Sequence, residues 1–132
     1  MFVEPYKNLL VWQKANELRR MIFQLTQPLE KNHRRLASQM QAAARSVPQN
    51  IAEAYKKGQL GTLIQATKVS GGSLEELLED LEDCQEDGII DPEKCAAALK
   101  NGRNTKYFID RYLVGLIKKQ ASGTWKSRWN PK

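Results

Sequence analysis

Apolar side chains recur every three or four residues through four long segments of the chain, and this spacing restricts the fold more than any other feature. Residues at that spacing line one face of an α-helix, and such a face must be buried against another element. The segments span residues 9–27, 32–57, 62–87 and 92–121, and no stretch alternates with the two-residue period of a strand. The sequence therefore predicts an all-α protein.

Prolines and glycines predict local features of these helices. Pro48 lies within the second segment, where the apolar spacing keeps its phase, so we expect one helix that is kinked at Pro48 rather than two helices. Gly71 and Gly72 would weaken the third helix by about 1 kcal/mol each relative to alanine, and we expect the close approach of a neighbouring backbone to compensate. Asp91 followed by Pro92 predicts a capped start of the fourth helix.

Only a few residues separate successive helices, and short links favour antiparallel neighbours. We therefore expect an antiparallel up-down-up-down four-helix bundle over residues 1–123. Residues 124–132 are expected to form a short basic and aromatic C-terminal tail.

Charge is distributed unevenly along the chain. Residues 1–72 carry a net charge of +7, residues 73–93 carry ten acidic and no basic side chains, and residues 94–132 carry a net charge of +9. Such blocks either neutralise one another by packing or present an electrostatic field to a partner. In an antiparallel bundle, many of the lysines would gather at one end, with only Glu4 and Glu53 as acids among them.

This basic end and the tail predict a binding site for nucleic acid. Lysines that neutralise phosphates release condensed counterions, and tryptophans beside basic residues can stack on unpaired bases. The alternative, a solvated basic face and a tail whose tryptophans have no ligand, stays open. The candidate residues are Lys14, Lys56, Lys57, Lys68, Lys118, Lys119, Trp125, Lys126, Arg128 and Trp129.

No residue pattern predicts catalysis, a metal site or a cofactor. His33 is the only histidine and stands among basic residues, which disfavours general-base catalysis. The acidic run at 75–83 lacks the Glu-x-x-His pairs of a di-metal carboxylate bundle. One histidine and two separated cysteines cannot supply a usual zinc set. We therefore expect a protein that is not an enzyme.

The cysteine content and the lack of long apolar runs bear on location. Cys84 and Cys95 are too few for the disulfide framework of a secreted protein, so we expect two reduced thiols. No apolar run reaches the length of a membrane span, and the N-terminus does not resemble a secretory signal. We expect a cytoplasmic protein with no membrane partner.

Three motifs resemble a known family. Residues 6–15 (YKNLLVWQKA) look like the opening of the bacterial four-helix-bundle proteins encoded in 23S rRNA intervening sequences. Residues 46–54 (SVPQNIAEA) resemble that family's SIPxNIAEG signature, and residues 72–77 (GSLEEL) are similar to its GSLxEL segment. The same fold group includes the accessory variability determinant of diversity-generating retroelements.

The resemblance implies a homo-oligomer, a pentamer, that binds RNA or DNA without catalysis and has a reverse transcriptase as a possible partner. It also implies a kink at Pro48. Ala54 stands where the family usually has glycine, and Gln41 and Ala42 stand where it usually has a basic pair, so contacts at the middle of the second helix need not carry over. An alternative within the same family is a protein-binding scaffold with no direct nucleic-acid contact.

Overall fold

The computed structural model describes residues 4–125, and within that part of the chain it contains helices and no strand. The all-α prediction is therefore confirmed. Two short 3-10 helices accompany the four long helices. In chain order the elements are η1 (Pro5–Asn8), α1 (Leu10–Thr26), η2 (Gln27–Leu29), α2 (Arg34–Lys57), α3 (Leu60–Glu86) and α4 (Pro92–Ser122).

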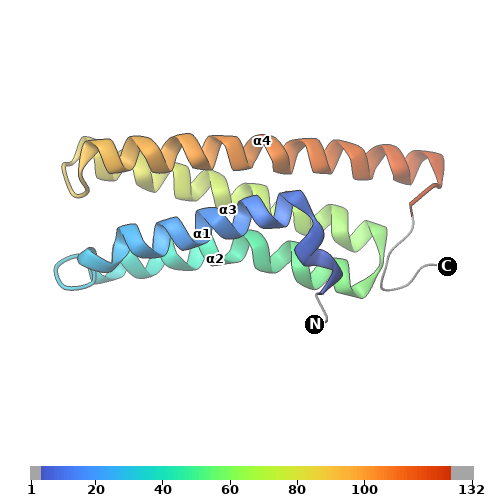
Figure 1. The fold of residues 1–132 in the computed structure, drawn as a ribbon, viewed down its shortest axis with the longest axis horizontal. Helices are drawn as coiled ribbons and strands as arrows, with labels where there is room; N and C mark the ends of the chain where they lie inside the picture. The colour runs from blue at the N-terminus through green and yellow to red at the C-terminus, as the bar shows by residue number, and fades with distance from the viewer. Residues whose placement is uncertain (1–3, 126–132) are drawn as a thin grey trace.

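Each long helix packs against two of the others. The helices α1 and α3 both contact α2 and α4. Figure 1 shows η2 and the link between α3 and α4 at one end of the molecule. The link between α2 and α3 lies toward the opposite end, together with η1 and the end of α4 (Figure 1). Segments that are distant in sequence thus meet at each end.

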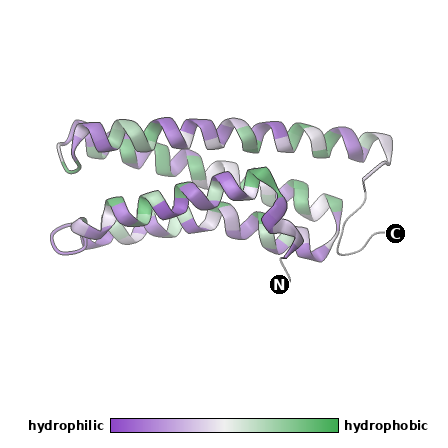
Figure 2. Cartoon of the chain, in the orientation of Figure 1, coloured by the Kyte–Doolittle hydropathy of each residue, from purple (hydrophilic) through white to green (hydrophobic). Residues whose placement is uncertain are grey.

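The core follows the predicted apolar spacing. Figure 2 shows hydrophobic and hydrophilic residues alternating along each long helix. Two isoleucines of α4 have opposite surroundings. Ile109 is fully buried, whereas Ile117 is 44% exposed. A helix turns by about 100° per residue, so the face that buries Ile109 also buries Leu116, seven residues later, and turns Ile117 away. The largest buried aliphatic side chains are Leu18, Ile22, Met40, Ile51, Leu63, Leu74, Leu77, Leu81 and Ile109.

The helix α2 continues through Pro48 as one element, as the sequence predicted. Pro48 lacks the N–H that would bond back to the preceding turn. Hydrogen bonds from α3 lie beside it: the Ser70 hydroxyl donates to the Val47 carbonyl over 2.8 Å, and the hydroxyls of Ser46 and Ser73 are 2.9 Å apart. Polar contacts therefore join α2 to α3 where α2 contains the proline.

The predicted cap at the start of α4 is also confirmed. Asp91 Oδ2 accepts a hydrogen bond from the backbone N–H of Lys94 over 3.1 Å, and Pro92 is the first helical residue. At this position Pro92 removes an N–H that would have no helical partner, while Asp91 satisfies another.

The close approach predicted at Gly71 and Gly72 is not found. A Cβ atom on Gly71 would make ordinary contacts with Lys106 and Ile109 side chains, and one on Gly72 would meet nothing within 4 Å. The tightly packed glycine is Gly102 on α4, where a Cβ would lie 2.6 Å from Leu78 Cδ2. Gly102 thus contacts a side chain of the neighbouring helix α3. The sequence could not identify Leu78 as its neighbour, because that depends on how α3 and α4 lie against each other.

We expect the substitution Gly72→Ala to raise the free energy of unfolding by up to about 1 kcal/mol, because alanine favours a helix interior and space is open there. The matched substitution Gly102→Ala should gain less, since Leu78 must move. Urea unfolding followed by circular dichroism measures both. A larger gain for Gly102→Ala than for Gly72→Ala would contradict this packing.

Both cysteines are free and buried. Cys84 Sγ lies 3.9 Å from Met40 Sδ in the core, and Cys95 Sγ lies 3.9 Å from the carbonyl oxygen of Ile90. Burial raises the pKa of the Cys84 thiol to about 11, with nearby ionisable groups adding to the effect. Burial also raises the pKa of Cys95. The two thiols are thus protonated at neutral pH.

We expect the folded protein to react slowly with iodoacetamide at pH 8, because both thiols are buried and the attacking species is the thiolate. The same protein in urea should react at the rate of an ordinary cysteine, whose pKa is about 8.5. Mass spectrometry over time measures labelling at each cysteine. Labelling of Cys84 at equal rates in the two conditions would contradict the buried placement.

Across the described residues, no helix combines the length and the apolar character needed to cross a membrane.

Candidate nucleic-acid interface

One end of the molecule is built from η1, the end of α2, the start of α3 and the end of α4 (Figure 1). A small apolar cluster holds these elements together. Its buried members are Ala54 and Tyr55 from α2, Leu63 and Ile64 from α3, and Leu116 from α4. Side chains that are partly buried against the cluster include Tyr6, Leu60, Leu113 and Trp125. We refer to this part of the molecule as the basic end because of the lysines that surround the cluster.

Four of the predicted lysines lie next to that cluster. Lys56 and Lys57 follow Tyr55 in the last turn of α2, and Lys118 and Lys119 follow Leu116 near the end of α4. All four side chains are exposed. Within residues 4–125, no carboxylate lies within 4.0 Å of any of them. The fold therefore brings four uncompensated positive charges to one end from helices that are distant in sequence.

Lys56 has an aromatic neighbour. Its Nζ lies 5.1 Å from the centroid of the Tyr6 ring, and Tyr6 in turn packs edge-on against Trp12 with ring centroids 5.3 Å apart. A cation over an aromatic face gains a modest attraction and remains open to a second, anionic partner. The side chain of Lys56 is thus positioned without its charge being neutralised.

Lys14 and Lys68 lie away from the basic end. Lys14 Nζ is 3.9 Å from Glu17 and 5.7 Å from the ring centroid of Phe108. Phe108 precedes Lys118 by ten residues, which is about 15 Å along α4. Lys68 is eight residues from the start of α3, about 12 Å from that end of the helix. The structure does not bring these two predicted residues together with the other four.

Trp125 contacts the apolar cluster and is partly buried. The sequence predicted a ring available for stacking on bases, but part of its surface is taken up by protein contacts. The other predicted residues of the tail, Lys126, Arg128 and Trp129, lie outside the described residues.

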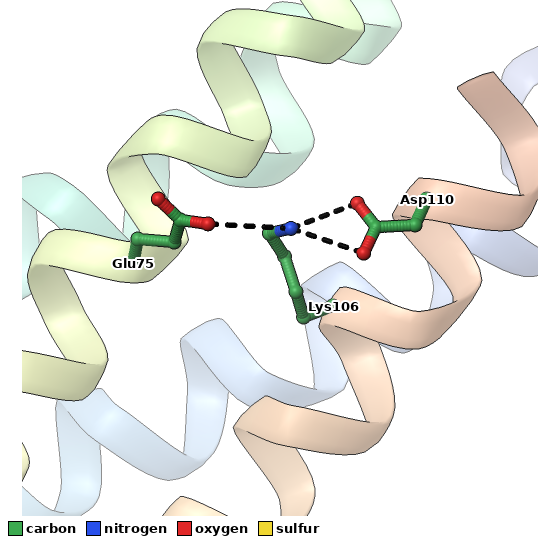
Figure 3. A network of polar contacts seen from close by, with 3 residues as sticks. All are labelled: Glu75, Lys106 and Asp110. Atoms are coloured by element: carbon green, nitrogen blue, oxygen red, sulfur yellow. Dashed lines mark hydrogen bonds and ion pairs between the residues drawn. The ribbon is translucent and has the colours of Figure 1, made fainter.

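The middle of α4 differs from its end because two of its positive charges, Arg103 and Lys106, are paired with carboxylates. Lys106 Nζ lies 2.8 Å from Asp110 Oδ1 and 3.4 Å from Glu75 on α3, and Figure 3 shows the lysine between the two carboxylates. The hydrogen bond to Asp110 raises the pKa of Lys106, which keeps it charged. One helical turn away, Arg103 lies 3.9 Å from Glu82. The acidic face of α3 thus pairs with Arg103 and Lys106, whereas Lys118 and Lys119 have no carboxylate partner in the described part of the chain.

The acidic run at residues 75–83 lies on α3. No group of three or more histidine, cysteine or acidic side chains within the described part of the chain is arranged to hold a metal ion. Partial burial raises the pKa of Asp80, the neighbouring acids raise it further, and a hydrogen bond from Gln39 lowers it. A raised pKa is what burial and mutual repulsion between carboxylates produce.

A second basic and aromatic group was not predicted. Arg19 and Phe23 on α1, with Gln41 and Arg45 on α2, line a small hollow on the surface. Each pair is four residues apart, which places its two members on one side of their helix. That spacing was visible in the sequence, but the relation between the two helices was not.

Comparison with known families gives one result. The sequence model of the 23S rRNA-intervening sequence protein family matches residues 7–109, more than three quarters of the chain. The matched region covers nearly all of the three motifs that resemble this family, together with α1, α2, α3 and more than half of α4. No curated protein matches the chain. The chain belongs to the family of 23S rRNA-intervening sequence proteins.

Proposed function

We propose that the protein is an antiparallel up-down-up-down four-helix bundle that binds nucleic acid through its basic end and has no catalytic activity. The observation that carries this proposal is the set of four exposed lysines, Lys56, Lys57, Lys118 and Lys119, that have no carboxylate within 4.0 Å in the described chain. Phosphates neutralised by such lysines release counterions, so the expected binding tolerates many sequences and weakens steeply with salt.

Membership of the family and the resemblance to the retroelement accessory proteins support RNA as the ligand, with DNA as an alternative, and a reverse transcriptase as a possible protein partner. Two buried free thiols are typical of proteins from reducing compartments, which supports a cytoplasmic location. In this role the protein positions a nucleic-acid strand and does not catalyse a reaction on it.

We also propose that the protein assembles as a homo-oligomer, a pentamer by the same resemblance. The outer surface of α4 supports assembly. Tyr107 is 59% exposed and Val114 is 45% exposed, and a spacing of seven positions, about two helical turns, places both on one face. Exposed aromatic and aliphatic side chains that share a face are typical of interfaces between proteins.

A protein-binding scaffold without nucleic-acid contact is the second candidate, and the exposed face of α4 favours it as well. In that case the basic end would interact with the acidic face of α3 on another molecule. The two candidates differ in what salt does: it would loosen assembly in the scaffold and weaken strand binding in the leading proposal.

The basic end is tested with fluorescein-labelled structured and single-stranded RNA, by anisotropy over a series of salt concentrations. Replacing Lys56, Lys57, Lys118 and Lys119 by glutamine should reduce the slope of log affinity against log salt by about 0.7 to 0.9 for each phosphate that is no longer neutralised. The control variant also replaces four basic residues by glutamine, so its change in charge is the same. These residues lie outside the basic end and are Lys31, Arg35, Lys94 and Lys100. No binding at low salt, or equal slopes in the two variants, would reject the proposal.

Assembly is tested separately by sedimentation velocity. The substitutions Tyr107→Ser and Val114→Ser together should shift the protein toward a monomer and leave its helical circular dichroism unchanged, because both side chains are outside the core. The control pair is Leu10→Ser and Val69→Ser, which removes two other exposed apolar side chains. A native protein that sediments as a monomer would contradict the proposed oligomer.

A further inference from the structure

A hollow of about 150 Å³ lies on the surface between α1 and α2, away from the basic end. It is lined by Arg19, Phe23, Gln41 and Arg45. Phe23 is 44% exposed, so part of its apolar ring faces solvent. A cavity of about this volume can hold a single six-membered aromatic ring.

The two arginines at the hollow are not neutralised. Arg19 is partly buried, and its Nε donates a hydrogen bond to Asn16 Oδ1 over 2.9 Å, which orients the guanidinium and leaves its two terminal nitrogens for a ligand. Arg45 is exposed. Over residues 4–125, neither guanidinium has a carboxylate within 4.0 Å. The guanidinium fork suits a phosphate better than any other common surface ligand except a carboxylate.

Gln41 supplies a fixed polar group. Its Nε2 donates to Thr26 Oγ1 over 3.0 Å and to Glu30 Oε1 over 3.2 Å, and the Thr26 hydroxyl donates to the carbonyl of Ile22 over 2.7 Å. Because the amide nitrogen is used in both of these bonds, the carbonyl oxygen of Gln41 is the group left to accept a hydrogen bond at the hollow.

We propose that this hollow binds one nucleotide of a single strand. The unpaired base stacks on Phe23, the adjacent phosphate binds Arg19 and Arg45, and Gln41 accepts a hydrogen bond from the edge of the base. This rests on the proposed function and specifies its ligand: a stacked base must be free of its partner strand, so the hollow selects single-stranded over duplex nucleic acid.

The hollow and the basic end lie on a continuous surface of α1 and α2. Arg45 precedes Lys56 by eleven residues on α2, and Trp12 precedes Phe23 by eleven residues on α1. Eleven residues are close to three full turns, so each pair shares a face and is separated by about 16 Å. Lys56 and Trp12 both contact the Tyr6 ring, as described above. A strand bound at the basic end can therefore follow the same face to the hollow.

The test uses a fluorescein-labelled twelve-nucleotide oligouridine and the same strand paired with oligoadenosine as a duplex, with anisotropy as the readout. Phe23→Leu should weaken binding of the single strand by about tenfold, because base stacking on an aromatic ring is lost, and should leave duplex binding unchanged. Phe23→Tyr keeps the ring and should keep the affinity. Both substitutions are at an exposed position, so the fold is expected to tolerate them.

The charge contribution is tested with Arg19→Gln and Arg45→Gln together. This pair should weaken single-strand binding several-fold more than the control pair Arg20→Gln and Arg111→Gln, which removes the same charge from exposed positions that do not line the hollow. Equal losses in the two pairs would show a general effect of charge and would overturn the site.

The remaining outcomes separate this site from the proposed function. Phe23 variants that bind the single strand like the native protein, while the lysine variants of the basic end lose affinity, would overturn the hollow and leave the proposed function standing. A Phe23→Leu protein with altered sedimentation and native affinity would overturn the nucleotide site and assign the hollow to a subunit interface instead. A native protein that binds neither probe would overturn both proposals.

Discussion

The burial of one face of α3 is the constraint on which the rest of the structure depends. This helix carries four fully buried leucines, Leu63, Leu74, Leu77 and Leu81, and contacts both α2 and α4. Burying a leucine side chain stabilises a protein by about 1.5 to 3 kcal/mol, so this face contributes a large part of the core. The same helix carries seven carboxylates and a single lysine, Lys68. The apolar face of α3 must be buried. Its acids must then lie where basic residues of α4 or water can offset their negative charge.

That arrangement decides where positive charge is available. In the middle of α4, Lys106 lies between Glu75 and Asp110, and Arg103 lies near Glu82. Toward the end of α4 the facing part of α3 is its first turns, which hold no acid before Glu75. Lys118 and Lys119 are therefore left without partners among the described residues, and the end of α2 adds Lys56 and Lys57 beside them. The basic end follows from the segregation of acids into the second half of α3.

The proposed interface also includes aromatic groups that the core does not need. Phe23 is exposed beside two arginines, and Tyr6 lies under Lys56. Such pairs suit a single-stranded nucleic acid, because the positive charges follow the phosphates and the rings stack on bases. For a member of the 23S rRNA-intervening sequence family, a surface along α1 and α2 would add selectivity for strand type to an otherwise electrostatic contact.

The sequence alone determined the helices, because helical periodicity, caps and breaks are local properties. The four long helices begin and end within about two residues of their predicted limits, and Asp91 caps α4 as expected. It also predicted that Lys56 and Lys57 share an end of the molecule with Lys118 and Lys119, because short links favour antiparallel neighbours. What only the tertiary structure decided is which side chains meet across helices. The separation of Lys14 and Lys68 from that end, the packing of Trp125 and the hollow between Arg19 and Arg45 depend on how each helix is shifted along its neighbours and rotated about its own axis. Neither quantity is encoded in the spacing of any one helix.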